Sequence, residues 1–163
     1  MDDFEKQKQE LLRPLFVEAG AALLDCQHFE YGLALLLFHL SRFGTKNLEA
    51  TAMCRILDNQ DRKTAGQLIQ MLKKHTTVSP GIETALADGL EARNTIIHRV
   101  LADNIEMVPK AETRTVLIKL IRQLRRKVRN ADTMLRPFIE SFSAAFDGVE
   151  LSKMEAEARA LFS

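Results

Sequence analysis

Apolar residues recur along most of the chain at intervals of four and three residues, which is the spacing of one face of an α-helix. In the first long segment these residues are Leu12, Phe16, Ala19, Leu23, Cys26, Leu33, Leu37 and Leu40. The pattern predicts a helix over about residues 14–43, begun by Pro14 and ended by Gly44. Glu30 stands where the series calls for an apolar residue. A carboxylate on a buried face is costly unless it is paired, so we expect Glu30 either to pair with Arg93 or to lie at the edge of the apolar stripe.

The middle of the chain contains three more segments with helical spacing. They are predicted over about residues 48–57, 65–75 and 81–102. Asn47, Thr64 and Ser79 precede these segments and are residue types that cap helix N-termini. Pro80 follows Ser79 and suits the first turn of the third helix.

The last part of the chain predicts one more long helix. Apolar residues continue at helical spacing over about residues 111–146, with a kink expected at Pro137 and an end at Gly148. A short acidic helix is expected within 149–163, and residues 1–12 form an N-terminal extension. No segment alternates as a β-strand does. The sequence therefore predicts an all-α fold, a single domain over 1–163 built as an up-and-down bundle of four or five helices.

Charge is unevenly distributed, although the 163 residues sum to a net charge of only +1. Residues 110–129 carry eight bases and one acid, whereas residues 1–30 carry seven acids and three bases. Arg122, Arg125, Arg126 and Arg129 are therefore candidate phosphate-binding residues. The alternative is that they belong to a solvated helix face paired with acidic segments elsewhere.

Composition narrows the class of protein further. There is no Trp and only one Tyr, which argues against platforms that stack nucleic-acid bases or sugars on aromatic rings. No apolar run approaches the roughly 20 residues of a membrane-spanning helix. The two cysteines and four histidines lack metal-binding spacing, so no metal and no cofactor are expected. These features favour a cytoplasmic protein with free thiols.

Chemically informative side chains are concentrated in the run Arg93-Asn94-Thr95-Ile96-Ile97-His98. Asn94 and His98 are four residues apart, so their side chains lie on one face of a helix. Arg93 lies farther around the helix, but its long guanidinium can curl back towards the same opening. Polar groups that interrupt an apolar face need partners from another helix, another subunit or a ligand.

This run resembles the R-x4-6-H motif of the HEPN superfamily. Gly66-Gln67-Leu68-Ile69 on an earlier helix is similar to a second pattern of such proteins, and the resemblance spans about residues 15–130. It implies a helical, usually dimeric, metal-independent endoribonuclease of the toxin, antiphage or RNA-processing type. The expected products carry 2′,3′-cyclic phosphate and 5′-hydroxyl ends.

The resemblance also implies a role for each motif residue. Arg93 contacts the scissile phosphate, His98 is the general acid or base, and Asn94 orients His98 or binds the phosphate. Glu30 is a candidate supporting residue. Two copies of the motif face each other across a homodimer, the substrate is RNA, and an antitoxin or another protein is a further expected partner.

The same residues are also compatible with a protein that binds a partner without catalysis. Many HEPN-like domains keep the motif for packing, so the chain is alternatively a non-catalytic helical dimer that binds protein or nucleic acid through its basic helix. Binding of that kind weakens steeply with salt and survives replacement of His98. A transcriptional regulator is disfavoured because no compact helix-turn-helix is recognisable.

Overall fold

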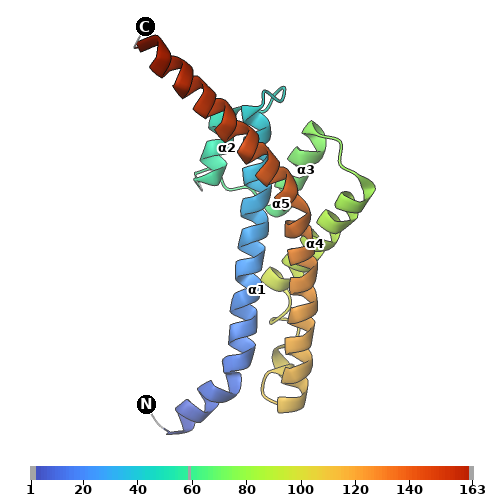
Figure 1. Ribbon diagram of the computed structural model, residues 1–163. Coiled ribbons are helices and arrows are strands. Elements are labelled where there is room, and N and C mark those ends of the chain that lie inside the picture. The colour runs from blue at the N-terminus through green and yellow to red at the C-terminus, as the bar shows by residue number, and fades with distance from the viewer. Residues whose placement is uncertain (1–2, 59, 162–163) are drawn as a thin grey trace. The chain divides into compact units, whose positions relative to one another are not determined.

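The computed structural model describes the backbone of residues 3–58 and 60–161 and the side chains of 6–58 and 60–146. Over that range the chain is helical and contains no strand, which confirms the all-α class (Figure 1). The elements are α1 (Asp3–Arg42), α2 (Ala50–Leu57), α3 (Ala65–His75), α4 (Pro80–His98), the short 3-10 helix η1 (Ile105–Met107) and α5 (Ala111–Leu161).

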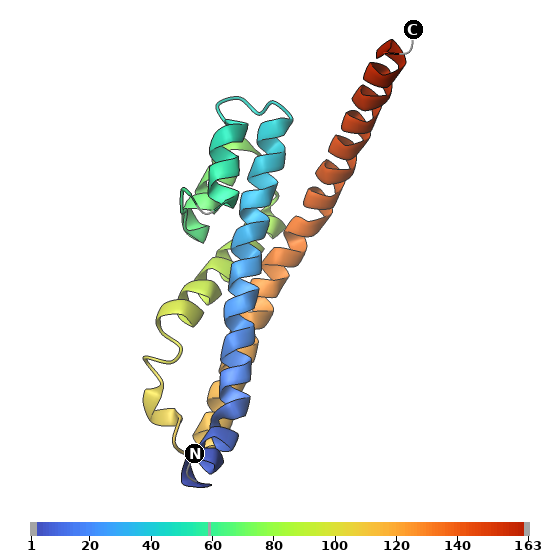
Figure 2. The same cartoon turned by 90° about the vertical axis from the view of Figure 1, so that its left-hand side faces the viewer.

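The helices pack into two compact units, to both of which α1 and α5 contribute. The first unit comprises Met1–Tyr31 and Thr77–Met134. Within it α1 and α5 run side by side in both views (Figures 1 and 2). Its buried side chains come from three helices: Leu15, Ala22, Cys26 and Phe29 of α1, Leu86, Ala92 and Ile96 of α4, and Leu117, Ile121, Val128 and Ala131 of α5.

The second unit comprises Gly32–Thr76 and Leu135–Ser163. Its buried core includes Leu33, Leu37, Met53, Ile56, Leu68, Leu72 and Leu135. The Thr64 cap is confirmed as a complete capping box, since its side chain accepts from Gln67 N and the Gln67 side chain accepts from Thr64 N. The predicted Asn47 cap is wrong. Asn47 has a positive φ of 63° in the turn before the helix, and Glu49 occupies the N-cap position.

In the two long helices, two predicted helix ends differ from the structure. Pro14 lies inside α1, which begins at Asp3, so the 1–12 extension continues the same helix. A proline removes one backbone hydrogen bond, and the first turns of α1 bend rather than separate (Figure 1). Gly148 does not end α5, whose backbone continues to Leu161 through the segment predicted as a separate acidic helix. Pro137 lies within α5 as well.

The start of α4 was correctly predicted, but its end was not. Ser79 is the N-cap and Pro80 the first helical residue, as expected, although the Ser79 side chain makes no capping hydrogen bond. The helix ends at His98 and not near residue 102. Arg99 N and Val100 N both bond to Thr95 O, which closes the last turn. His98 is therefore the terminal residue of α4.

In the first half of α1 the buried face is turned by about one residue from the predicted stripe. Leu15, Ala22 and Phe29 are buried, whereas Phe16 is 59% exposed and Leu23 is 45% exposed. Apolar residues occupy adjacent positions here, so helical spacing alone fits either face. Phe16 and Leu23 are left at the surface of the first unit.

Ion pairs link α1 to α5 within the first unit. Glu18 is 7% exposed and accepts hydrogen bonds from Arg122 Nε at 2.8 Å and from Arg125 Nη1. Asp25, two turns further along α1, accepts from Arg125 Nε at 2.7 Å. These contacts hold two basic side chains of α5 against α1.

Glu18 is expected to make the stability of the protein fall as the pH is lowered into the acid range. Burial raises its pKa, but hydrogen bonds from Arg122 and Arg125 outweigh that effect and keep the pKa below its ordinary value of 4.5. The stabilisation is therefore complete above the unfolded pKa and is lost as pH falls through the folded one. Thermal unfolding should be measured for the wild type and for Glu18→Gln from about pH 7 to pH 3. The wild type is expected to have the higher Tm at neutral pH, and the difference in Tm should become smaller as the pH falls. A gap that stays constant with pH would contradict this account.

Candidate functional site

Arg93 is fixed on α4 by two directional hydrogen bonds. Its Nε donates to Glu30 Oε1 of α1 at 2.6 Å, and its Nη1 donates to Asn94 Oδ1 at 3.0 Å. The predicted pairing of Glu30 with Arg93 is therefore confirmed. The Arg93 and Glu30 side chains are 15% and 29% exposed, so the contact is largely shielded from water. Neither hydrogen bond uses Nη2, the second terminal nitrogen of the guanidinium.

Asn94 and His98 share a surface next to this pair. Both side chains are exposed, and both line an open pocket of about 470 Å³. Glu91, Thr95 and Arg99 complete its lining. The i,i+4 spacing thus places Asn94 and His98 on one face, as predicted. Because its Oδ1 accepts from Arg93, Asn94 presents its amide NH₂ as a donor.

An apolar pocket of about 340 Å³ adjoins the other side of His98. Ala19, Ala22, Leu23 and Ile121 line it together with the chain from Ile96 to Ala102. Leu23, Ile97 and Leu101 are 45%, 37% and 37% exposed. His98 therefore lies between a polar and an apolar surface, and both pockets belong to the first unit.

The four arginines proposed to bind phosphate do not form a single group. Arg125 is 23% exposed and bonded to Glu18 and Asp25, so its charge is already offset inside the unit. Arg122 makes one of these bonds and remains 59% exposed. Arg126 and Arg129 are exposed. The sequence reasoning missed the two α1 carboxylates as specific partners, although their spacing of seven residues placed them on one helix face.

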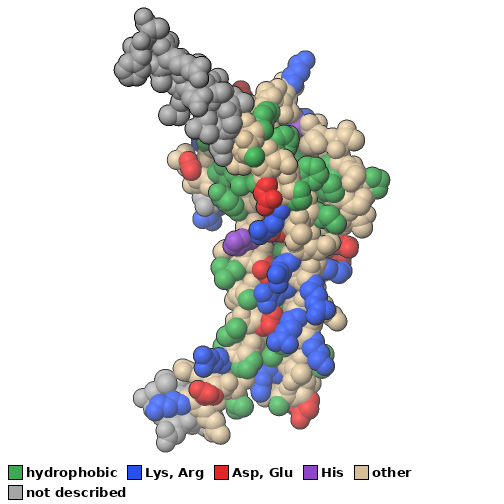
Figure 3. Space-filling model, viewed as in Figure 1, with side chains coloured by type: hydrophobic (Ala, Val, Ile, Leu, Met, Phe, Trp, Pro, Cys, Tyr) green, Lys and Arg blue, Asp and Glu red, His purple; other side chains and the backbone are tan. Residues whose placement is uncertain are grey.

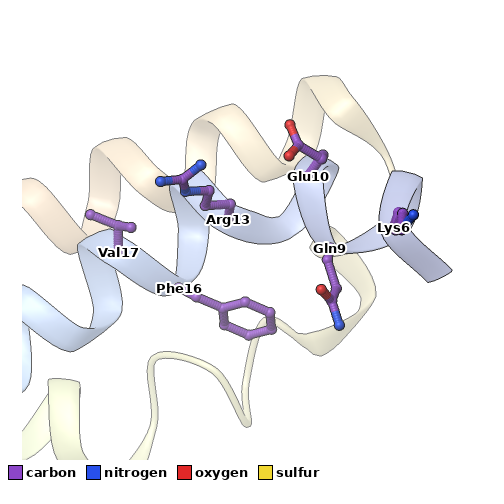
Figure 4. A pocket seen from close by; sticks show the side chains of 6 residues that line it. All are labelled: Lys6, Gln9, Glu10, Arg13, Phe16 and Val17. Atoms are coloured by element: carbon purple, nitrogen blue, oxygen red, sulfur yellow. The ribbon is translucent and has the colours of Figure 1, made fainter. Parts of the chain in front are cut away.

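A pocket of about 760 Å³ lies near the start of α1. Its lining residues are Lys6, Gln9, Glu10, Arg13, Phe16 and Val17. Figure 4 shows Phe16 and Gln9 pointing to one side of the helix and Arg13 and Glu10 to the other. Polar groups that fix a ligand converge on it, and these do not. The Arg93 region is therefore the better candidate site.

The described residues give less support to a cysteine nucleophile, a metal site or a membrane-spanning helix. Cys26 is buried, and burial, only partly offset by Arg93, raises the pKa of its thiol to about 11. Thiolates are the nucleophilic form of cysteine, so this thiol is unreactive at neutral pH. Among the side chains of residues 6–58 and 60–146, no three His, Cys, Asp or Glu gather as metal ligands do. Within the described backbone no helix is long and apolar enough to span a membrane.

Comparisons with protein-family models, with curated proteins and with solved structures found no match. The HEPN resemblance therefore depends on the motif residues of the sequence alone.

Proposed function

We propose that the Arg93, Asn94 and His98 site is a HEPN-like, metal-independent endoribonuclease site. The observation that carries the proposal is the arrangement at the end of α4: a guanidinium held by Glu30 and Asn94, with an exposed histidine five residues further along the helix. In the reaction a 2′-hydroxyl attacks the adjacent phosphorus and the 5′-oxygen leaves. The products are a 2′,3′-cyclic phosphate and a 5′-hydroxyl.

Each side chain suits one part of this reaction. Nη2 of Arg93 makes neither the hydrogen bond to Glu30 nor that to Asn94, so its N–H groups can donate to a phosphate oxygen, where a planar cation offsets developing charge. The Asn94 amide NH₂ is a second donor at the pocket surface. His98 is exposed, as a group that exchanges protons with substrate must be, and imidazole is the side chain suited to this exchange at neutral pH.

The reaction needs both a base and an acid, and the described site contains a single histidine, His98. A homodimer supplies the second. One His98 takes the proton of the 2′-hydroxyl, and His98 of the second copy protonates the leaving oxygen. The apolar surface of Leu23, Ile97 and Leu101 beside His98 is the surface we assign to this contact, because apolar side chains at the centre of an interface favour association. A cytoplasmic location and an antitoxin or other protein partner accompany this proposal.

The proposal is tested by RNA cleavage in the presence of EDTA. The wild type is expected to migrate as a dimer and to cleave single-stranded RNA, with products identified by mass spectrometry. His98→Ala is expected to lower kcat by about 100-fold or more, the usual contribution of a positioned acid or base. His28→Ala removes an equally exposed histidine from α1 and is expected to leave cleavage unchanged. Full activity in His98→Ala, or a fully active monomer, contradicts the corresponding part of the proposal.

One observation favours the non-catalytic alternative. The Arg93 side chain is only 15% exposed and donates two hydrogen bonds inside the protein, as a purely structural arginine does. In that case the chain is a helical module that binds a partner or nucleic acid without cleaving it. RNA that is bound but never cleaved, by both the wild type and His98→Ala, is the result this alternative predicts.

A further inference from the structure

Four basic residues form an exposed row along the outer face of α5. Lys119, Arg122, Arg126 and Arg129 follow one another at intervals of three, four and three residues, which places them on one side of the helix. All four are exposed, and this side lies opposite the buried positions of α5. Figure 3 shows Lys and Arg side chains gathered along α5. At 1.5 Å per residue, this basic row is about 15 Å long.

Little negative charge from the protein offsets the basic row. Residues 113–131 contain seven Lys or Arg and no Asp or Glu. The two α1 carboxylates in contact with α5, Glu18 and Asp25, are bonded to Arg122 and Arg125. Among the described residues no ion pair includes Lys119, Arg126 or Arg129. The solvated-face alternative therefore accounts for Arg125 and part of Arg122 only.

The row has an energetic cost that an anion would remove. Neighbouring like charges at i,i+3 and i,i+4 destabilise a helix by about 0.2–0.5 kcal/mol per pair. The row contains three such pairs of neighbours. Two of them include Arg122, whose charge is partly offset by Glu18, and the third is Arg126 with Arg129. Arginine forks also match phosphate oxygens in geometry.

We propose that the basic row binds the phosphodiester backbone of a nucleic acid. Its exposed neighbours Thr115, Gln123, Asn130 and Thr133 are polar, and only at one end of the row is an exposed apolar residue, Val116, beside it, so this face lacks the apolar centre of a protein interface. Residues 113–131 contain no Phe, Tyr or Trp, so no ring is present to stack on a base. The basic row is therefore expected to bind the phosphate groups of the nucleic acid whatever their base sequence. This binding does not depend on cleavage at His98.

Fluorescence anisotropy measures binding of the whole 163-residue protein, in the oligomeric state that it adopts in solution, to labelled probes. The probes are 20 nucleotides or 20 amino acids long. Probes of single-stranded RNA, duplex RNA and duplex DNA separate the sources of phosphate, and polyglutamate represents an acidic protein. A row of three to four contacts predicts a slope of log affinity against log salt of roughly −3 for duplexes. Arg126→Gln/Arg129→Gln is expected to weaken nucleic-acid binding about tenfold and to reduce the slope by roughly two.

A control with the same change in net charge is Arg62→Gln/Lys63→Gln, both of which are exposed outside α5. It is expected to bind as the wild type does. Equal affinity and slope for the two double variants, or tighter binding of polyglutamate than of nucleic acid, would overturn the proposal. Thermal unfolding should show no loss of Tm in the row variant, because like charges are removed. The outcome is separable from cleavage, since duplex DNA lacks the 2′-hydroxyl that the proposed reaction needs and should still be bound by the basic row.

Discussion

Gly89→Ala is expected to destabilise the protein by about 1–3 kcal/mol, the usual cost of overpacking a core. A Cβ added at Gly89 would lie 2.5 Å from Ala131 Cβ, closer than two such carbons can approach. Ala131 Cβ is attached directly to the backbone of α5, so only movement of a helix can relieve the clash. Phe29 Cζ at 3.5 Å and Lys127 O at 3.6 Å would lie at ordinary contact distance from the added Cβ, so the clash is with Ala131.

The matched control is the same substitution where space is open. A Cβ at Gly20, inside α1, meets nothing within 4 Å. Alanine is the better helix former by about 1 kcal/mol, so Gly20→Ala should raise Tm while Gly89→Ala lowers it by several degrees, measured by circular dichroism. Adding Ala131→Gly to Gly89→Ala should recover part of the loss. A Gly89→Ala protein as stable as the wild type would show that α4 and α5 do not pack this closely.

The helices themselves were largely predictable, because each has a run of apolar residues at helical spacing. Their lengths were not. Pro14 and Gly148 are residue types that end helices, yet α1 and α5 continue through them. The cost of such a residue is local, and the rest of a long helix can outweigh it. The buried face of α1 was also ambiguous, because apolar residues adjoin one another at Leu15 and Phe16.

For the candidate site, local spacing was informative and long-range pairing was only partly so. Asn94 and His98 lie on one surface because four residues is about one helical turn. Glu30 could be matched to Arg93 since a carboxylate in an apolar series demands a cation. Glu18 gave no such signal, because its place on the buried face follows from the register of α1, and its partner Arg122 lies 104 residues away.

Arg93→Lys is expected to lower kcat for RNA cleavage by about 100-fold or more, within the range for loss of one transition-state donor. A lysine has one compact ammonium group. It cannot donate to Glu30 and Asn94 in the observed directions and still present a third donor to a phosphate. The same change should reduce stability by about 1–3 kcal/mol, because it leaves a partly shielded acceptor without its partner. Initial rates and urea unfolding measure the two effects separately.

Glu30→Gln separates positioning from simple structural support. Glutamine keeps an acceptor oxygen for Arg93 Nε but removes the charge, so Glu30→Gln should lower kcat by less than Arg93→Lys and leave KM unchanged. Arg62→Lys makes the same substitution at an exposed position away from the site and is the control for Arg93→Lys. It should change neither kcat nor the free energy of unfolding. If Arg93→Lys lost stability but kept full kcat, Arg93 would serve only to tie α4 to α1, and the phosphate would have to be held by Asn94, His98 or Arg99, which line the same pocket. Loss of kcat in Arg93→Lys at temperatures where the variant remains folded would place Arg93 among the groups that act on the substrate.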